Sequence, residues 1–145
     1  DVSGPTTLNA GVMMYDEKRA EIAVSMRHSV TYPFDDKLRL AHEAVQPFHV
    51  ALDVADYSPP HYVPEDDALV ATLLDVYRQY TGDMQKPLST GGGTYARELK
   101  KGVAFGMLFP GEVELAHQQD EFVDIANLMK AVAIYAAAIE RLAAN

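Results

Sequence analysis

Three consecutive glycines, Gly91, Gly92 and Gly93, stand directly before the hydroxyl of Thr94 and close to the cation of Arg97. Glycine has no Cβ, so such a segment lets backbone N–H groups approach a ligand closely. With its hydroxyl and cation, the segment could hold an anionic or carbonyl oxygen. The endings typical of a P-loop and of a dinucleotide-binding fingerprint are both missing. A flexible loop without a ligand is the alternative interpretation.

A second polar group runs from Ala116 to Glu121 and reads Ala-His-Gln-Gln-Asp-Glu. Imidazole is the commonest neutral ligand of zinc or manganese, and nearby carboxylates usually orient it. One histidine does not complete a site, because a catalytic zinc has about three protein ligands. His117 is therefore either one ligand of a larger site or a surface or capping residue.

Arg27 ends a segment in which apolar and small residues alternate, and His28 follows it. An arginine at the end of a strand can bind a carboxylate through two parallel hydrogen bonds. The alternatives are a solvated side chain and one arm of a salt bridge.

The elements that must position these residues begin with a predicted hairpin. Strand-like runs cover Leu8–Tyr15 and Ala20–Met26, and the polar break 16–19 between them fits a turn. A helix follows Pro33, with Asp35 or Asp36 expected to cap its start.

A third predicted strand covers His49–Tyr57, so the order strand, strand, helix, strand matches half of a two-layer α+β sandwich. Three prolines within 58–64 then mark the best domain boundary. Beyond it we expect a helix over Glu65–Tyr80 that ends at Gly82 and that an acidic run opens. The remaining predicted elements are a short helix after the glycines, a strand over Val103–Phe109 and a final helix over Phe122–Ala143.

Composition limits the function classes. The chain has 145 residues, 48% of them apolar, and its 12 basic against 21 acidic residues give a formal charge of −9. So acidic a chain repels phosphates, and we expect neither nucleic-acid nor membrane partners. It contains no cysteine, which excludes disulfides and thiolate ligands and fits a cytoplasmic location. The start at Asp1 without Met suggests a piece of a longer protein.

Four motifs occur in a specific order: Gly-Gly-Gly-Thr-Tyr-Ala-Arg, Gly-Val-Ala-Phe-Gly-Met-Leu-Phe-Pro-Gly, Ala-His-Gln-Gln-Asp-Glu and a terminal Ala-Ile-Tyr-Ala-Ala-Ala-Ile-Glu-Arg-Leu. This order resembles the C-terminal end of PepV-type bacterial dipeptidases, in the clan of cocatalytic-metal peptidases that includes carnosinases and aminoacylases. The opening Gly-Pro-Thr-Thr-Leu-Asn-Ala-Gly and Ser25-Met26-Arg27 resemble the second half of that family's lid domain. In place of the expected Tyr-Pro after the arginine, this chain has His28-Ser29.

The resemblance implies an α+β and α/β fragment of a two-lobed enzyme. Residues 1–60 would be the C-terminal half of a ferredoxin-like lid. Residues 61–145 would be the last strand and helix portion of the catalytic domain.

The resemblance also implies roles for the candidate residues. His117 would be the last metal ligand, and Glu121 would support it. Arg27 would bind the free C-terminal carboxylate of a peptide substrate. The substrate pocket would be lined by Gly92, Gly93 and Thr94, with Arg97 either in the pocket or anchoring its loop.

In such enzymes two divalent ions, zinc first and manganese or cobalt as alternatives, activate water and polarise the scissile carbonyl. A glutamate transfers the proton to the leaving amine, and lid closure completes the site. The glutamate and the other metal ligands would lie upstream, in the missing N-terminal part of the enzyme. We therefore expect the isolated chain to be inactive.

A non-catalytic acidic α+β module for binding or dimerisation is the rival interpretation. It would keep the shape of the lid without its chemistry. Excision would also leave strand edges unpaired, so we expect some tendency of the fragment to form a homodimer.

Overall fold

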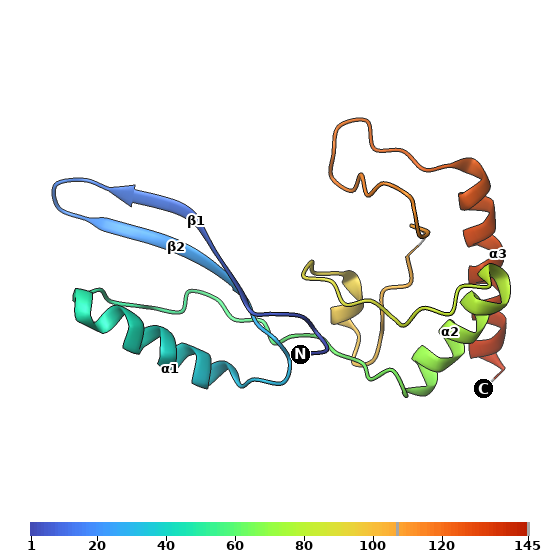
Figure 1. Ribbon diagram of the computed structural model, residues 1–145, viewed down its shortest axis with the longest axis horizontal. Coiled ribbons are helices and arrows are strands. Elements are labelled where there is room, and N and C mark those ends of the chain that lie inside the picture. The colour runs from blue at the N-terminus through green and yellow to red at the C-terminus, as the bar shows by residue number, and fades with distance from the viewer. Residues whose placement is uncertain (107, 145) are drawn as a thin grey trace. The chain divides into compact units, whose positions relative to one another are not determined.

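The computed structural model describes residues 1–106 and 108–144. Contacts within the chain divide it into two compact units. Unit 1 is Asp1–Tyr62 with Ser89–Gly92, and unit 2 is Val63–Leu88 with Gly93–Asn145. Unit 1 contains a hairpin and a helix, and unit 2 contains two helices (Figure 1). The assignment of residues 1–60 to a lid and 61–145 to a catalytic domain stays a prediction.

The predicted hairpin is confirmed. Strands β1 (Thr7–Tyr15) and β2 (Ala20–Arg27) pair antiparallel. The register shifts between Ala10 and Val12, so one residue of β1 has no partner opposite it. Paired residues point to the same face of a sheet, and the hairpin therefore has one face lined at its open end by polar side chains and an opposite face that is apolar.

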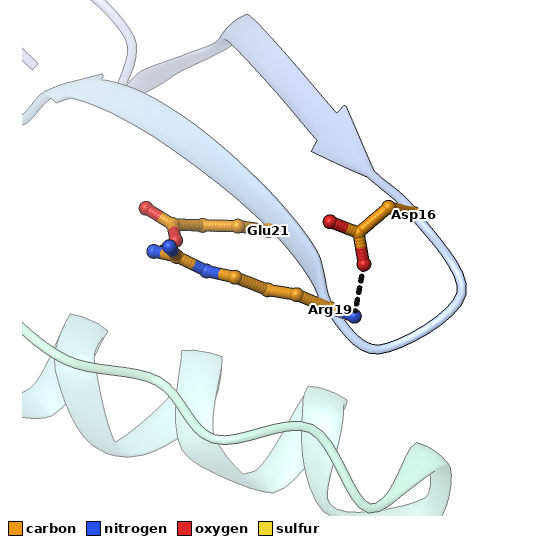
Figure 2. A network of polar contacts seen from close by, with 3 residues as sticks. All are labelled: Asp16, Arg19 and Glu21. Carbon is orange, nitrogen blue, oxygen red and sulfur yellow. Dashed lines mark hydrogen bonds and ion pairs between the residues drawn. The ribbon is translucent and has the colours of Figure 1, made fainter.

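The turn of the hairpin is closed by Asp16. Its carboxylate accepts hydrogen bonds from the backbone N–H groups of Lys18 at 2.7 Å and Arg19 at 2.9 Å, and its own N–H donates to the Arg19 carbonyl at 2.7 Å. Arg19 also pairs with Glu21, whose side chain lies beside it in Figure 2. Asp is favoured in turns because its short side chain accepts hydrogen bonds from backbone N–H groups two or three residues further along the chain.

Helix α1 (Phe34–Val45) follows Pro33 as predicted and continues into η1 (Gln46–Phe48), a 3₁₀ helix of one turn. The predicted side-chain cap is wrong. The capping position is Pro33, which has no side-chain acceptor, while Asp35 and Asp36 lie inside the first turn. There their negative charges interact favourably with the positive end of the helix dipole instead.

The predicted strand over His49–Tyr57 is also wrong: no strand occurs at these residues, all of which the structure describes. His49 adopts a left-handed conformation with φ 56° that ends the preceding 3₁₀ turn. A strand needs a hydrogen-bonded partner, and the segment uses aromatic stacking instead. The Tyr57 ring stacks on Phe34 of α1 with centroids 4.3 Å apart.

Unit 2 is built on helices α2 (Ala68–Thr81) and α3 (Ile125–Ala143). Both start three residues later than the sequence predicts, because an aspartate caps each one. Asp67 accepts from the N–H of Leu69 at 2.9 Å, and Asp124 accepts from that of Asn127 at 3.0 Å. Gly82 ends α2 with φ 71°, a left-handed conformation that favours glycine.

The hydrophobic core of unit 2 lies where α2 and α3 pack together, side by side in Figure 1. Its buried members are Leu73, Val76, Ile134 and Ala138. Among the described helices, none is long and apolar enough to cross a membrane.

The segment between the glycines and α3 departs from prediction in part. The expected short helix is the 3₁₀ helix η2 (Tyr95–Glu98). The predicted strand over Val103–Phe109 is absent at every residue of it that the structure describes, Met107 lying outside. Its apolar side chains pack on the helical core instead, and Tyr135 of α3 donates a hydrogen bond to the Phe105 carbonyl at 2.9 Å.

Candidate functional site

An open polar pocket of about 240 Å³ lies at the open end of the hairpin in unit 1. It is lined by Thr7 and Asn9 of β1 and by Ser25 and Arg27 of β2. The register explains this grouping, because Thr7 pairs with Arg27 and Asn9 pairs with Ser25. The four side chains therefore leave the sheet on one face. Two hydroxyls, an amide and a guanidinium converge there.

The guanidinium of Arg27 is the only charged group in this pocket. Within the described residues, no carboxylate lies at ion-pair distance from it. Of the alternatives open to this arginine, the salt bridge is therefore not the arrangement seen. A planar guanidinium presents its donors in a fixed fork that matches a carboxylate. The pocket thus has the size and the donors for a small anionic group.

Sequence reasoning singled out Arg27 but missed Thr7, Asn9 and Ser25. The signal was available in the strand pairing. Residues two apart on each strand share a face, and polar side chains at alternate positions near an arginine mark a polar end on an otherwise apolar hairpin.

The glycine segment begins beside Arg27. The contacts of Ser89–Gly92 place these residues in unit 1, and the Ser89 hydroxyl donates to the Val2 carbonyl at 2.9 Å. A Cβ added to Gly91 would lie 3.2 Å from a terminal nitrogen of the Arg27 guanidinium. Gly91, which sequence reasoning did not assign to the pocket, is thus the glycine against which the arginine rests.

The N–H of Gly92 donates to the hydroxyl of Thr90 at 3.1 Å, so that donor is already used. Gly91, Gly92 and Gly93 have no left-handed φ. These glycines therefore contribute the space that a missing Cβ leaves, and none of them supplies a left-handed backbone conformation.

Gly93, Thr94 and Arg97 belong to unit 2. A Cβ added to Gly93 would lie 3.2 Å from a guanidinium nitrogen of Arg97, which also pairs with Glu98 at 3.4 Å. The carbonyl of Thr94 accepts a hydrogen bond from the Arg97 backbone N–H at 3.3 Å. Of the two roles considered for Arg97, this geometry favours anchoring of the loop.

His117 lies in an exposed loop of unit 2 and has φ 64°, a backbone conformation that is uncommon outside glycine. Its backbone N–H donates to the carboxylate of Glu121 at 3.2 Å. The N–H of Gln118 donates to the Leu115 carbonyl at 3.0 Å, which tightens the same turn. Glu121 thus contacts the backbone of His117 and leaves the imidazole exposed.

The sequence profile described as Peptidase family M20/M25/M40 matches residues 2–141. The chain belongs to this family. A protein named "Putative dipeptidase" from Staphylococcus epidermidis is 38% identical over 98% of the M20 chain. Proteins of the same description from Staphylococcus haemolyticus and Staphylococcus aureus strain USA300 are 36% and 39% identical, again over 98% of the chain.

These alignments cover only 30% of each relative's length. The M20 chain therefore corresponds to less than one third of the curated relatives that it matches.

M20 peptidases are generally metal-dependent, and the described residues of this chain offer only part of a metal site. They contain no group of three or more His, Asp or Glu side chains that could hold an ion. The exposed imidazole of His117 has the right chemistry for one ligand. A complete site in an M20 enzyme would therefore need ligands from outside the described residues.

Proposed function

We propose that this chain is part of a PepV-type dipeptidase that hydrolyses short peptides with a free C-terminal carboxylate, and that Arg27 binds that carboxylate. The observation that carries the proposal is the open polar pocket, in which an arginine with no carboxylate partner among the described residues meets two hydroxyls and an amide. The family assignment and the names of the relatives support peptide hydrolysis as the reaction class.

In this proposal the pocket recognises the end of the substrate. The guanidinium of Arg27 donates two parallel hydrogen bonds to the carboxylate, and Thr7, Asn9 and Ser25 offer further polar partners at its rim. Gly91 leaves room for the guanidinium, because any larger residue would press on it. Fixing the position of the carboxylate limits the substrate to short peptides.

His117 is proposed as one ligand of a divalent metal pair, zinc first and manganese or cobalt as alternatives. When bound, such a pair supplies an activated water and polarises the scissile carbonyl. The contribution of this chain is to hold one imidazole outward. The turn at Leu115 and the carboxylate of Glu121 fix the backbone of His117 for that purpose.

The carboxylate proposal is tested in the complete enzyme that contains this chain. We expect Arg27→Lys to lower kcat/KM for a dipeptide by about tenfold or more, because lysine keeps the charge but loses the fork. A C-terminally amidated dipeptide should lose far less. The matched control is Arg19→Lys, in the hairpin turn, which should change neither value. Equal losses for the free and the amidated dipeptide would refute the carboxylate role.

The metal proposal has a readout that does not depend on activity. His117→Ala should reduce the bound metal per enzyme, measured by elemental analysis, without lowering the melting temperature of the metal-free protein. His42→Ala, in the last turn of α1, is the control and should keep the full metal content. Unchanged metal content in the His117 variant would exclude it as a ligand. The isolated 145-residue chain should show no turnover with added metal.

We also propose that the isolated chain self-associates, with a second copy covering its hairpin. The sheet has two strands and so two unpaired edges, and its apolar face is exposed, with Ile22 and Val24 more than half accessible. Light scattering should show dimers that dissociate in an Ile22→Lys variant. A monomer at high concentration would contradict this proposal.

A further inference from the structure

Carbonyl groups of the backbone between β2 and α1, residues 28–32, are held by Lys37 in the first part of α1. The ammonium donates to the carbonyl oxygens of Ser29 at 3.0 Å and Tyr32 at 2.7 Å, and it lies 3.2 Å from Nδ1 of His28. Lys37 is 9% exposed and is the only buried charged side chain in the described part of the chain.

The N–H groups of the same segment are held by polar side chains that precede β1. They accept hydrogen bonds from three successive backbone N–H groups: Ser29 N–H to Thr6 at 3.4 Å, Val30 N–H to Ser3 at 3.0 Å and Thr31 N–H to Asp1 at 2.9 Å. Three N–H groups and two carbonyls of this irregular segment are therefore bound by side chains.

Burial of the Lys37 ammonium costs free energy unless hydrogen bonds within the protein replace those to water. A buried ammonium loses its hydration, and within the described residues Lys37 has no carboxylate partner to offset that loss. Two carbonyls and one imidazole take the place of water. An ammonium has only donors, so Nδ1 accepts from it in one tautomer of the His28 ring; in the other tautomer Nδ1 donates to the Ser29 carbonyl, 3.3 Å away.

The His28 ring is also fixed by packing. Its centroid lies 5.4 Å from that of Phe34 and 5.9 Å from that of Tyr57. His28 follows Arg27 directly, and Arg27 is the last residue of β2. Beyond this point the strand ladder no longer orients the chain. The peptide that follows Arg27 is thus held by the contacts of residues 28–32 and not by the strand ladder.

We propose that Lys37 is a positioning residue for Arg27: by fixing residues 28–32, it keeps the guanidinium aligned with the carboxylate of the substrate. This inference rests on the proposed carboxylate-binding function of Arg27. Lys37 contacts no lining residue of the pocket in this proposal, and it acts only through the backbone that follows β2.

The test compares Lys37→Met with Arg39→Met in the complete enzyme. Both remove one cation from α1, but Arg39 is exposed and pairs only with Glu43. Lys37→Met should raise KM for a free-carboxylate dipeptide by about tenfold with little change in kcat, because a misplaced binding group weakens binding. KM for the amidated dipeptide should stay constant. Arg39→Met should change none of these values.

A purely structural lysine would behave differently, since it would lower the melting temperature without changing the ratio of KM values for free and amidated substrate. That result would overturn the positioning role. Should Lys37→Met fail to fold, His28→Leu serves instead. It removes one of the three acceptors, keeps an apolar side chain beside Phe34, and should shift the same ratio in the same direction by a smaller factor.

The Arg27→Lys variant separates the two proposals. If it changes the KM ratio and the Lys37 and His28 variants do not, the positioning role is wrong and the carboxylate site stands. If Arg27→Lys leaves the ratio unchanged, the carboxylate site is wrong and the inference about Lys37 is wrong with it.

Discussion

In unit 2, α2 and α3 bury apolar side chains against each other, whereas in unit 1 the hairpin and α1 bury none. Residues 1–62 are all described, and the one side chain among them that is buried is the charged Lys37. The described residues of unit 2 include six buried apolar side chains, among them Val76 with no exposed surface and Ile134 at 2%. Unit 1 is ordered by a strand ladder, a polar turn and a buried ammonium.

Unit 2 is thus the part of the chain with an apolar core of its own, and unit 1 is the part that carries the candidate site. The polar face of the hairpin carries the pocket around Arg27, and its apolar face is open, with Leu8 at 69% and Ile22 at 57% exposure. An apolar sheet face of this kind is normally covered by another layer. The relatives are about three times as long as this chain, which leaves ample sequence for such a layer.

The largest expected effect tests the buried half of the comparison. Ile134→Ala should lower the free energy of unfolding of unit 2 by about 2–4 kcal/mol, because it removes apolar contacts and leaves a cavity between α2 and α3. Ile139→Ala is the control on the same helix: its side chain is 68% exposed, and the loss should stay below about 0.5 kcal/mol. Denaturant unfolding followed by helical circular dichroism measures both. Equal losses would mean that this core does not stabilise the unit.

A smaller effect tests the polar half. Asp16→Ala removes the acceptor of two backbone N–H groups in the hairpin turn and should destabilise the hairpin by about 1 kcal/mol. Amide hydrogen exchange along β1 and β2 should then accelerate by about fivefold, while exchange in α2 and α3 stays constant. Asp16→Asn keeps an acceptor and should retain most of the protection. Faster exchange in the helices would show that the two units are not independent.

The same contrast explains what could be predicted from the sequence. Turn, cap and periodicity signals are local, so the hairpin, the three helices and the stop at Gly82 were predictable to within a few residues. The strands predicted over 49–57 and 103–109 depend on partners far away in sequence. Without a hydrogen-bonded neighbour, Tyr57 stacks on Phe34 and Phe105 packs on α3.

The residues of the candidate site likewise divide into those that the sequence alone indicates and those that depend on the fold. Arg27, the glycines and His117 were found because residue type and order alone single them out. The grouping of Thr7, Asn9 and Ser25 with Arg27 was missed, because it follows from the register of two strands. The role of Lys37 is invisible in the sequence, since its acceptors are mostly backbone carbonyls.

The smallest expected effect concerns the cap of α2. Lys101 lies 2.8 Å from the carboxylate of Asp67, and this hydrogen bond, with a second from the Leu69 N–H, lowers the pKa of Asp67 below its ordinary value of 3.8. Lys101→Met should therefore raise the pKa of Asp67, measured by NMR titration of its carboxyl carbon. Lys100→Met removes the neighbouring charge and should leave the titration in place. A shift of equal size in both variants would show that general charge, not this contact, is responsible.

The sign of the pH dependence follows from that shift. Because the pKa of Asp67 is lower in the folded than in the unfolded chain, the cap contributes its full stability above pH 3.8, and the contribution is lost as the pH falls through the lowered value. Unit 2 should thus lose helix stability on acidification below pH 3.8, and Lys101→Met should make that loss smaller and complete it at a higher pH. The N-cap of α1 in unit 1 is Pro33 and not an aspartate paired with Lys101, so Lys101→Met should leave the acid response of that helix unchanged. A change of equal size in the acid unfolding of both units on Lys101→Met would therefore contradict the separation of a capped, apolar unit from one held by a buried ammonium.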